Sequence, residues 1–150
     1  MDADITIVGG GLAGLALAVA LRNARLNVVL VEGRPPARSQ NDADWDSRLY
    51  ALSPANANFL ESIGVWKHVP AERRCGVQAM EIYGDAGSEL HFSAYDSGVS
   101  ELAWIVESSL LQSELWLSAQ RQANLNLLCP ARPAKLAIGA ETAVLTLGDG

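Results

Sequence analysis

The sequence contains few residues of the kinds that build disulfide-linked or metal-bound folds. Its 150 residues include 2 cysteines, Cys75 and Cys129, which stand at no spacing typical of a zinc site or a disulfide framework. His68 and His91 likewise have no carboxylate or cysteine at ligand spacing, so we expect no metal site. Sparse, unpaired cysteine favours a reducing compartment, and we expect a cytoplasmic protein.

Basic residues are also scarce. The 11 lysine and arginine residues are scattered and outnumbered by 17 acidic residues, which gives a net charge of −6. A nucleic-acid binder needs a cluster of cations to neutralise phosphates, so we exclude nucleic acid as a partner.

The chain lacks the features of a targeting or membrane segment as well. Residues 5–21 are uncharged, but Asp2 and Asp4 precede them where a signal peptide has basic residues. A membrane-spanning helix needs about 20 apolar residues, and this shorter run is interrupted by glycines. We therefore expect no membrane span here.

What remains is the pattern of an ordinary folded domain of the α/β class. With 49% hydrophobic and 19% charged residues, a chain of this length buries roughly 70% of its unfolded surface. Residues 4–8 and 27–31 are short apolar runs typical of buried parallel strands, and we place 4–8 at the centre of the sheet. Residues 12–23, rich in leucine and alanine, predict a helix between them. These segments predict a βαβ unit and a Rossmann-like fold.

The rest of the chain predicts further elements around this unit. Residues 33–47 have no period and many turn residues, and we expect a functional or mobile loop there. Ser53 as N-cap, Pro54 at the first helical position and Gly64 as stop predict a second helix. The other predicted elements are strands 103–106 and 125–128, hairpins of 77–83 with 88–92 and of 133–138 with 142–147, and a helix over 109–123 opened by a capping box of Ser109 and Gln112.

The most informative motif, Gly9-x-Gly11-x-x-Gly14, lies between the first predicted strand and the first predicted helix. In this context the first glycine permits a tight turn, the second admits a pyrophosphate close to the backbone, and the third lets helix and strand pack closely. Leu12 and Ala13, at the start of the helix, add free N–H groups and the positive end of the helix dipole. The motif predicts a dinucleotide site, and a glycine turn that serves packing alone is the alternative.

Glu32 follows the second predicted strand, where an acid can accept hydrogen bonds from ribose hydroxyls. A turn that served packing alone would not require an acid at this position. A carboxylate here repels the 2′-phosphate of NADP, so FAD and NAD remain as ligands of this site.

Four strings of residues resemble the flavin-dependent aromatic hydroxylases of ubiquinone biosynthesis, which have the para-hydroxybenzoate hydroxylase fold. They are residues 4–32 with the glycine motif, 46–53 (DSRLYALS), 60–66 (LESIGVW) and 104–108 (WIVES). The glycine motif is shared by many nucleotide-binding proteins, whereas the second and fourth strings are more selective. The resemblance spans nearly the whole chain.

This resemblance implies an FAD-dependent monooxygenase that hydroxylates the aromatic ring of a polyprenylated phenol with O2. It implies reaction through a flavin C4a-hydroperoxide, with NADPH or NADH as reductant, while the protein supplies position and electrostatics. It identifies no catalytic residue. Association with the inner membrane or with a biosynthetic complex, through regions outside this chain, is a further expectation. The residues expected to contact FAD are Gly9, Gly11, Leu12, Ala13, Gly14, Glu32, Arg34, Arg48 and Ser108.

Two of these residues have plain alternatives. By resemblance Arg48 lies at the phosphate or ribityl part of FAD, but on its own it fits a surface arginine paired with Asp44 or Asp46. Ser108 is expected near the ribityl chain or the flavin, and it equally fits a helix cap. Trp45 is the one tryptophan that we expect near a ligand.

The sequence departs from the family in three respects. Arg25 stands where glycine commonly ends the first helix, so the usual left-handed cap must be replaced or strained. The later Asp-Gly and Gly-Asp motifs are missing, and Asp149-Gly150 reads as a turn. The main sheet of the substrate domain is missing too. We expect residues 1–150 to be an incomplete, truncated FAD-binding domain, of which residues 75–105 contribute strands to a substrate domain.

On this interpretation the chain alone should be inactive and should bind FAD weakly or not at all. Two other functions stay open. One is an FAD oxidoreductase of another substrate class, against which the Arg48 string argues. The other is a non-catalytic nucleotide-binding fragment, which the missing half of the site favours.

Overall fold

The computed structural model of the chain describes residues 1–36 and 45–148, which fall into two compact units. The first unit comprises residues 1–39 and 112–150, and the second comprises residues 40–111. Most of the predicted loop 33–47, with Asp44, lies outside the described residues, and so does the predicted Asp149-Gly150 turn.

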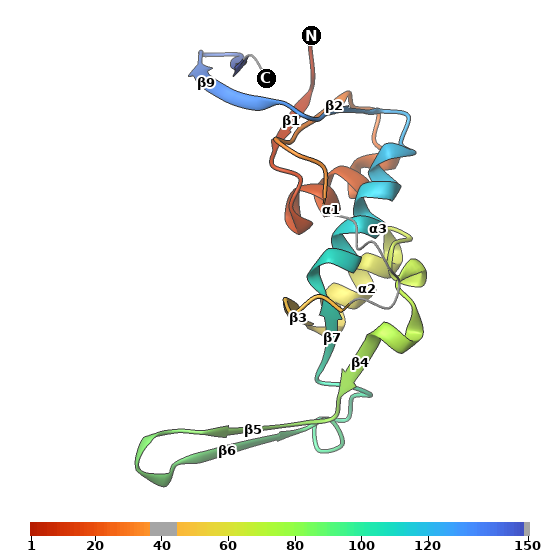
Figure 1. The fold of residues 1–150 in the computed structure, drawn as a ribbon, viewed down its shortest axis with the longest axis vertical. Coiled ribbons are helices and arrows are strands. Elements are labelled where there is room, and N and C mark those ends of the chain that lie inside the picture. The colour runs from red at the N-terminus through yellow and green to blue at the C-terminus, as the bar shows by residue number, and fades with distance from the viewer. Residues whose placement is uncertain (37–44, 149–150) are drawn as a thin grey trace. The chain divides into compact units, whose positions relative to one another are not determined.

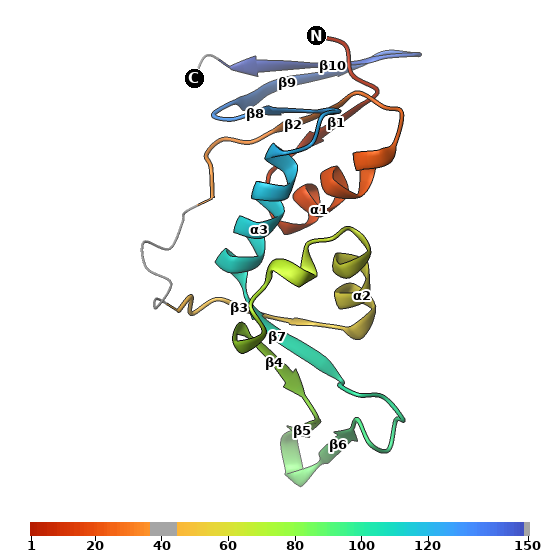
Figure 2. The ribbon, with the colours of Figure 1, turned by 90° about the vertical axis from the view of Figure 1, so that its right-hand side faces the viewer.

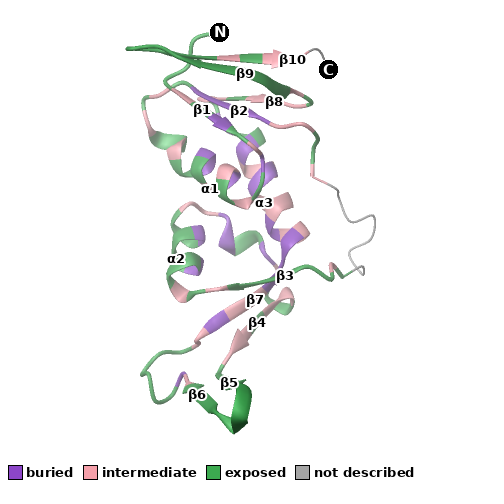
Figure 3. Ribbon diagram, turned by 90° about the vertical axis from the view of Figure 1, so that its left-hand side faces the viewer, coloured by how far each residue is buried: buried purple, intermediate pink, exposed green. Residues whose placement is uncertain are grey.

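The first unit is built on a parallel sheet. Strands β1 (Ile5–Val8), β2 (Val28–Val31) and β8 (Leu125–Leu128) pair in the order β1-β2-β8. All residues of β2 are buried, whereas β1 leaves Val8 exposed (Figure 3). The prediction that residues 4–8 form the central strand is wrong, because within the described sheet β1 pairs on one side only.

Helices cover one face of this sheet (Figures 1 and 2). Helix α1 (Leu12–Ala20) continues into a 3-10 turn, η1 (Leu21–Asn23), and buries Leu15 completely. Helix α3 (Ser108–Gln120) begins in the second unit, and its residues from Gln112 onward belong to the first. The order β1, α1, β2 confirms the predicted βαβ unit and the α/β class.

The end of the first helix shows how the chain manages without a glycine at Arg25. Arg25 has no left-handed backbone conformation. Instead, the Asn124 side-chain amide donates to the carbonyl oxygens of Leu21, Ala24 and Leu26 at 3.0, 3.2 and 3.0 Å. A side chain from the other end of the unit therefore replaces the usual cap.

The last strands of the first unit form a hairpin. Strands β9 (Arg132–Ile138) and β10 (Ala143–Gly148) pair antiparallel, with a register shift between Thr146 and Leu147. The hairpin predicted from the sequence is thereby confirmed.

The second unit is built on an antiparallel sheet of order β3-β7-β4. Its strands are β3 (Leu49–Leu52), β7 (Ala103–Glu107) and β4 (Arg74–Val77), and α2 (Pro54–Ser62) packs against β3 and β7. The sequence analysis found β7 but missed β3 and β4, which are short and have no clear alternation. Their pairing with the more hydrophobic β7 holds them in the sheet.

Local signals set the ends of α2. The Ser53 hydroxyl accepts a hydrogen bond from the Asn56 N–H at 3.3 Å, Pro54 begins the helix, and Gly64 follows it with φ of +76°. This confirms the predicted helix and both of its boundary signals. The 3-10 turn η2 (Trp66–His68) then places Trp66 edge-to-face against Trp104, with ring centroids 5.9 Å apart.

A second hairpin belongs to this unit. Strands β5 (Ala79–Tyr83) and β6 (Glu89–Ser93) pair antiparallel around the turn η4 (Asp85–Gly87), close to the predicted 77–83 and 88–92. Met80 pairs with Phe92 and Ile82 with Leu90, so the strand alternation places these four side chains on one face. All four are exposed.

Candidate functional site

The glycine motif forms the turn between β1 and α1. Gly9 has φ of +105°, a conformation that favours glycine, and its N–H donates to the Val31 carbonyl at 2.8 Å. Gly14 is packed so tightly that an added Cβ would lie 2.1 Å from the Gly9 carbonyl oxygen. A Cβ on Gly11 would meet no atom within 4 Å. Packing therefore explains Gly14, whereas Gly11 borders open space.

The start of α1 faces this space without a side-chain cap. Gly11 is the N-cap residue, and α1 has no acidic residue in its first turn. The first helical hydrogen bond runs from the Leu15 N–H to the Gly11 carbonyl at 3.0 Å, which leaves the preceding N–H groups, those of Leu12 and Ala13 among them, outside the helical pattern. Such a helix start attracts anions.

Glu32 lies directly after β2 and contacts the glycine turn. Its Oε2 accepts a hydrogen bond from the Gly10 N–H at 2.5 Å, and its Oε1 accepts one from the Arg34 N–H at 3.1 Å. Partial burial raises the pKa of the Glu32 carboxyl, but hydrogen bonds from the backbone of Gly10, Arg34 and Gly33, with the charge of Arg34, together lower it below its ordinary value. Since a carboxylate offers about four acceptor positions, some remain for ribose hydroxyls.

Gln112, in α3, also contacts the glycine turn, and its sequence position does not predict this contact. Its side-chain amide donates to the Gly10 carbonyl at 2.8 Å, so Gly10 is held at its N–H by Glu32 and at its carbonyl by Gln112. The predicted capping box is wrong, because the Gln112 side chain is directed to Gly10 and α3 begins at Ser108. No local signal in the sequence distinguishes a glutamine that caps its own helix from one that reaches a distant loop.

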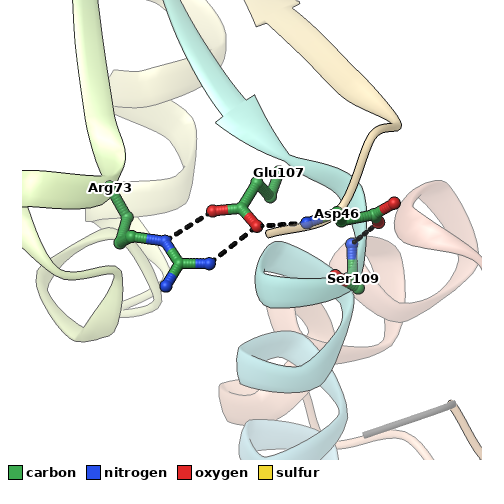
Figure 4. A network of polar contacts seen from close by, with 4 residues as sticks. All are labelled: Asp46, Arg73, Glu107 and Ser109. Carbon is green, nitrogen blue, oxygen red and sulfur yellow. Dashed lines mark hydrogen bonds and ion pairs between the residues drawn. The ribbon is translucent and has the colours of Figure 1, made fainter. Parts of the chain in front are cut away.

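The second unit contains a network of polar contacts around Glu107, the last residue of β7 (Figure 4). We call Arg73, Glu107, Asp46 and Ser109 the Glu107 network. The Arg73 Nε and Nη2 atoms lie 2.6 and 2.7 Å from the two Glu107 carboxylate oxygens. The hydrogen bond from Arg73 lowers the pKa of Glu107 most strongly; burial opposes it, and the Asp46 N–H and the Arg73 charge lower the pKa further.

The network extends through Asp46 to the start of α3. The Asp46 N–H donates to Glu107 Oε2 at 2.7 Å, and the Asp46 carboxylate accepts from the Ser109 N–H at 3.0 Å and the Arg48 N–H at 2.9 Å. Hydrogen bonds from Arg48 and Ser109 lower the pKa of Asp46. Asp46 thus caps α3 from a distant segment, as Ser108 and Ser109 were expected to do locally.

The structure places the remaining expected site residues as follows. Arg34 and Arg48 are exposed, and among the described residues the Arg48 guanidinium makes no hydrogen bond or ion pair. Ser108 is buried, and its N–H donates to the Arg48 carbonyl at 2.9 Å. Trp45 is 68% exposed and stacks under Arg73, with 4.0 Å from the guanidinium carbon to the ring centroid. Arg48 and Ser108 are thus neighbours across the β3–β7 pairing.

The described residues contain neither a group arranged to bind a metal ion nor a helix able to span a membrane. Within residues 1–36 and 45–148 no group of His, Cys, Asp and Glu is arranged to hold a metal ion. Cys75 and Cys129 are both free thiols, and burial raises the pKa of Cys129. In the same described ranges, none of the helices has the length and hydropathy needed to cross a bilayer.

Comparison with known families identifies the first part of the chain. Residues 4–45, which contain β1, the glycine turn, α1, β2 and Glu32, match the FAD binding domain family. The first unit is therefore of the α/β class, and residues 4–45 are similar to FAD-binding domains. The flavin-dependent monooxygenase PieE, solved with FAD and substrate, has the same fold, with a TM-score of 0.68 and 19% identity over 98% of this chain and 27% of that chain.

Curated relatives narrow the class further. The chain is 32% identical to the 3-demethoxyubiquinol 3-hydroxylase of Escherichia coli over 127 residues, 85% of this chain and 32% of the relative. It is 30% identical to the ubiquinone hydroxylase UbiL of Rhodospirillum rubrum over 148 residues, 99% of this chain and 34% of the relative. The chain is thus a sequence relative of the ubiquinone-biosynthesis hydroxylases, which confirms the predicted resemblance. It spans about a third of the length of these relatives.

Proposed function

We propose that the chain is the FAD-binding part of a flavin-dependent monooxygenase that hydroxylates an aromatic ring in ubiquinone biosynthesis. The observation that carries this proposal is the open space at Gly11, at an uncapped helix start and beside the ionised Glu32. A pyrophosphate fits the helix start, and ribose hydroxyls fit the acid. The match of residues 4–45 to FAD binding domains supports FAD over NAD.

Each expected residue then has a role toward FAD. Gly9 and Gly14 shape the turn, and the N–H groups of Leu12 and Ala13 hold the pyrophosphate beside Gly11. Glu32 binds the adenosine ribose with the acceptor positions that the backbone leaves unused. From the resemblance, Arg34 adds positive charge near the phosphates, and Arg48 and Ser108 contact the ribityl or flavin part.

The substrate and the reductant are proposed from the family resemblance. We propose a polyprenylated phenol as substrate, O2 as oxidant and NADPH or NADH as reductant, with the bound flavin supplying the oxygen chemistry. The similarity to a 3-demethoxyubiquinol 3-hydroxylase and a ubiquinone hydroxylase supports a substrate of this chemistry. A cytoplasmic enzyme peripheral to the inner membrane would meet such an apolar substrate.

The domain assignment also stays a proposal. We infer that residues 75–105 contribute strands to a substrate domain. The β5–β6 hairpin supports this, since its exposed face of Met80, Phe92, Ile82 and Leu90 is apolar. An isolated hairpin is marginally stable in water, so this face needs a covering layer.

The sharpest test of the cofactor site is Gly11→Ala. The added methyl group enters the open space, so in the longer enzyme FAD affinity in a flavin-fluorescence titration should fall at least about tenfold, while the free energy of unfolding changes by less than about 1 kcal/mol. Gly148→Ala is the matched control, because its Cβ meets only Ala134 and Arg132 atoms at 3.7 and 3.8 Å in β10. Unchanged FAD affinity in Gly11→Ala would reject the site. A parallel NAD titration distinguishes FAD from NAD as the ligand.

A further inference from the structure

Glu107 is a buried acid for which the proposed function has no use. It is 2% exposed, and it is the glutamate of the string WIVES, which carries part of the family resemblance. An ionised carboxylate so far from water is stable only when it is paired and hydrogen-bonded. Its partners therefore indicate what it is for.

The pairing partner is Arg73, in the 3-10 turn η3 (Ala71–Arg73) before β4. The planar guanidinium holds both carboxylate oxygens, at 2.6 and 2.7 Å, and it also lies over the Trp45 ring. This fork-to-fork geometry fixes the orientation of the carboxylate as well as its charge. Lysine could supply the charge but not the orientation.

The oriented carboxylate in turn holds a backbone segment. Glu107 Oε2 accepts the Asp46 N–H at 2.7 Å, and the Asp46 carboxylate holds the N–H groups of Arg48 and Ser109 at 2.9 and 3.0 Å. The Arg48 carbonyl then accepts the Ser108 N–H at 2.9 Å. A continuous set of contacts therefore runs from Arg73 to the backbone of Arg48.

We propose that Glu107, oriented by Arg73, is a positioning residue that fixes the segment Asp46–Arg48 against the start of α3 and so presents Arg48 to FAD. The Arg48 part rests on the proposed function. A role in fold stability alone explains the arrangement less well, because a buried ion pair contributes little net stability compared with apolar residues of similar volume. An ion pair that holds a backbone N–H of this segment has a more specific effect.

The first experiment measures the positioning itself by 15N-resolved NMR of the 15.9 kDa chain. The groups facing Glu107 are Arg73 from η3 and Asp46 from the segment before β3. As the pH is lowered, the Asp46 amide proton should follow the protonation of Glu107. In Glu107→Gln the part of this dependence that follows Glu107 should vanish, leaving only the titration of the Asp46 carboxyl itself, and the Arg48 and Ser109 amide signals should shift.

Glu61→Gln, on the exposed surface of α2, is the control and should leave all three amide signals unchanged. If Glu107→Gln does not fold, Arg73→Lys tests the same step, because it keeps the charge but loses the fork. Unchanged Asp46 and Arg48 signals in a folded Glu107→Gln or Arg73→Lys chain would overturn the positioning role.

The second experiment is a double-mutant cycle for FAD affinity, measured by fluorescence titration in the longer enzyme of which we propose this chain to be a part. Glu107→Gln should weaken FAD roughly tenfold, and should add nothing further in an Arg48→Ala background. Additive losses would overturn action through Arg48. If Arg48→Ala alone leaves FAD affinity unchanged, the assignment of Arg48 to FAD fails, while the amide signals still decide whether Glu107 holds the segment.

Discussion

The glycine turn and the Glu107 network both use a carboxylate to hold backbone N–H groups, but they do so in different surroundings. Glu32 is partly exposed and accepts from the Gly10 and Arg34 backbone. Glu107 is 2% exposed, and its two carboxylate oxygens accept hydrogen bonds from the Arg73 guanidinium and the Asp46 N–H. Among the described residues, the ion pair of Arg73 with Glu107 has no counterpart at Glu32.

This difference separates a structural acid from a ligand-binding one. A buried carboxylate needs a cation because its desolvation is costly, and the cation then occupies the positions that a ligand would use. A partly exposed carboxylate such as Glu32 is held mainly by backbone N–H groups and keeps acceptor positions free. Glu107 is therefore suited to position its neighbours, and Glu32 is suited to bind.

The largest expected effect is on stability, and it tests the structural role of Glu107. Glu107→Ala leaves the Arg73 charge and the Asp46 N–H without their buried partner, and we expect a loss of about 3–5 kcal/mol in the free energy of unfolding. Urea denaturation followed by tryptophan fluorescence measures it. Glu61→Ala, an exposed control, should cost much less. A loss for Glu107→Ala no greater than that of Glu61→Ala would place Glu107 outside any supporting role.

Gly14→Ala probes packing in the other region. Its Cβ would lie 2.1 Å from the Gly9 carbonyl oxygen, so helix and strand must move apart, and we expect a loss of about 1–3 kcal/mol. Thermal unfolding of this variant beside Gly11→Ala separates the two glycines. Equal stabilities would show that the turn does not depend on close packing at Gly14.

How far the sequence predicts these regions depends on the range of the interactions. The glycine motif and the caps of α2 act within a few residues, and Glu32 follows from its place directly after β2 in the βαβ unit; the turn, β2 and α2 lie where those signals predict them. Gln112 and Asp46 act across large sequence separations, so their partners follow from the fold and not from local spacing. The same cause explains the missed strands β3 and β4, which are held by β7.

The candidate site residues also differ in whether local sequence predicts them. The dinucleotide residues carry a motif whose physical reason is local, whereas the buried pair of Arg73 and Glu107 carries none, because a glutamate after an apolar strand fits a surface position equally well. The central place given to β1 failed for a related reason. Strand order within a sheet is set by pairing, and β1 and β2 have similar apolar sequences.

On the binding side, Glu32→Ala in the full-length enzyme should weaken FAD binding by about 1–3 kcal/mol, because hydrogen bonds to a charged acceptor are lost. The variant also frees the Gly10 N–H, so its effect includes a looser turn. Isothermal titration against Glu72→Ala, an exposed control, measures the difference. FAD affinity equal to that of the control would remove the ribose assignment.

Acid should affect the Glu107 network through protonation. The pKa of Glu107 is lowered in the folded state from about 4.5, so its contribution to stability is fully present above that pH and is lost as the pH falls through the lower, folded value. The free energy of unfolding should therefore decline more steeply below about pH 4.5 in the parent chain than in Glu107→Gln. Parallel curves would show that Glu107 is not linked to folding.

Substitution of Arg48 gives the smallest expected change in stability. It tests whether the segment held by the Glu107 network contributes to FAD binding. Its guanidinium is exposed and has no described partner, so Arg48→Ala and Arg48→Lys should each change the free energy of unfolding by less than about 1 kcal/mol. If Arg48 contacts the flavin part of FAD, Arg48→Ala should reduce flavin occupancy in the full-length enzyme. Arg48→Lys should restore it only in part, because an ammonium cannot reproduce a planar fork of donors. The flavin-to-protein absorbance ratio, at matched FAD concentration and salt, measures occupancy in all three proteins. Equal ratios would show that Arg48 is a surface residue beside Asp46. FAD binding would then depend on the glycine turn and Glu32, and not on the Glu107 network.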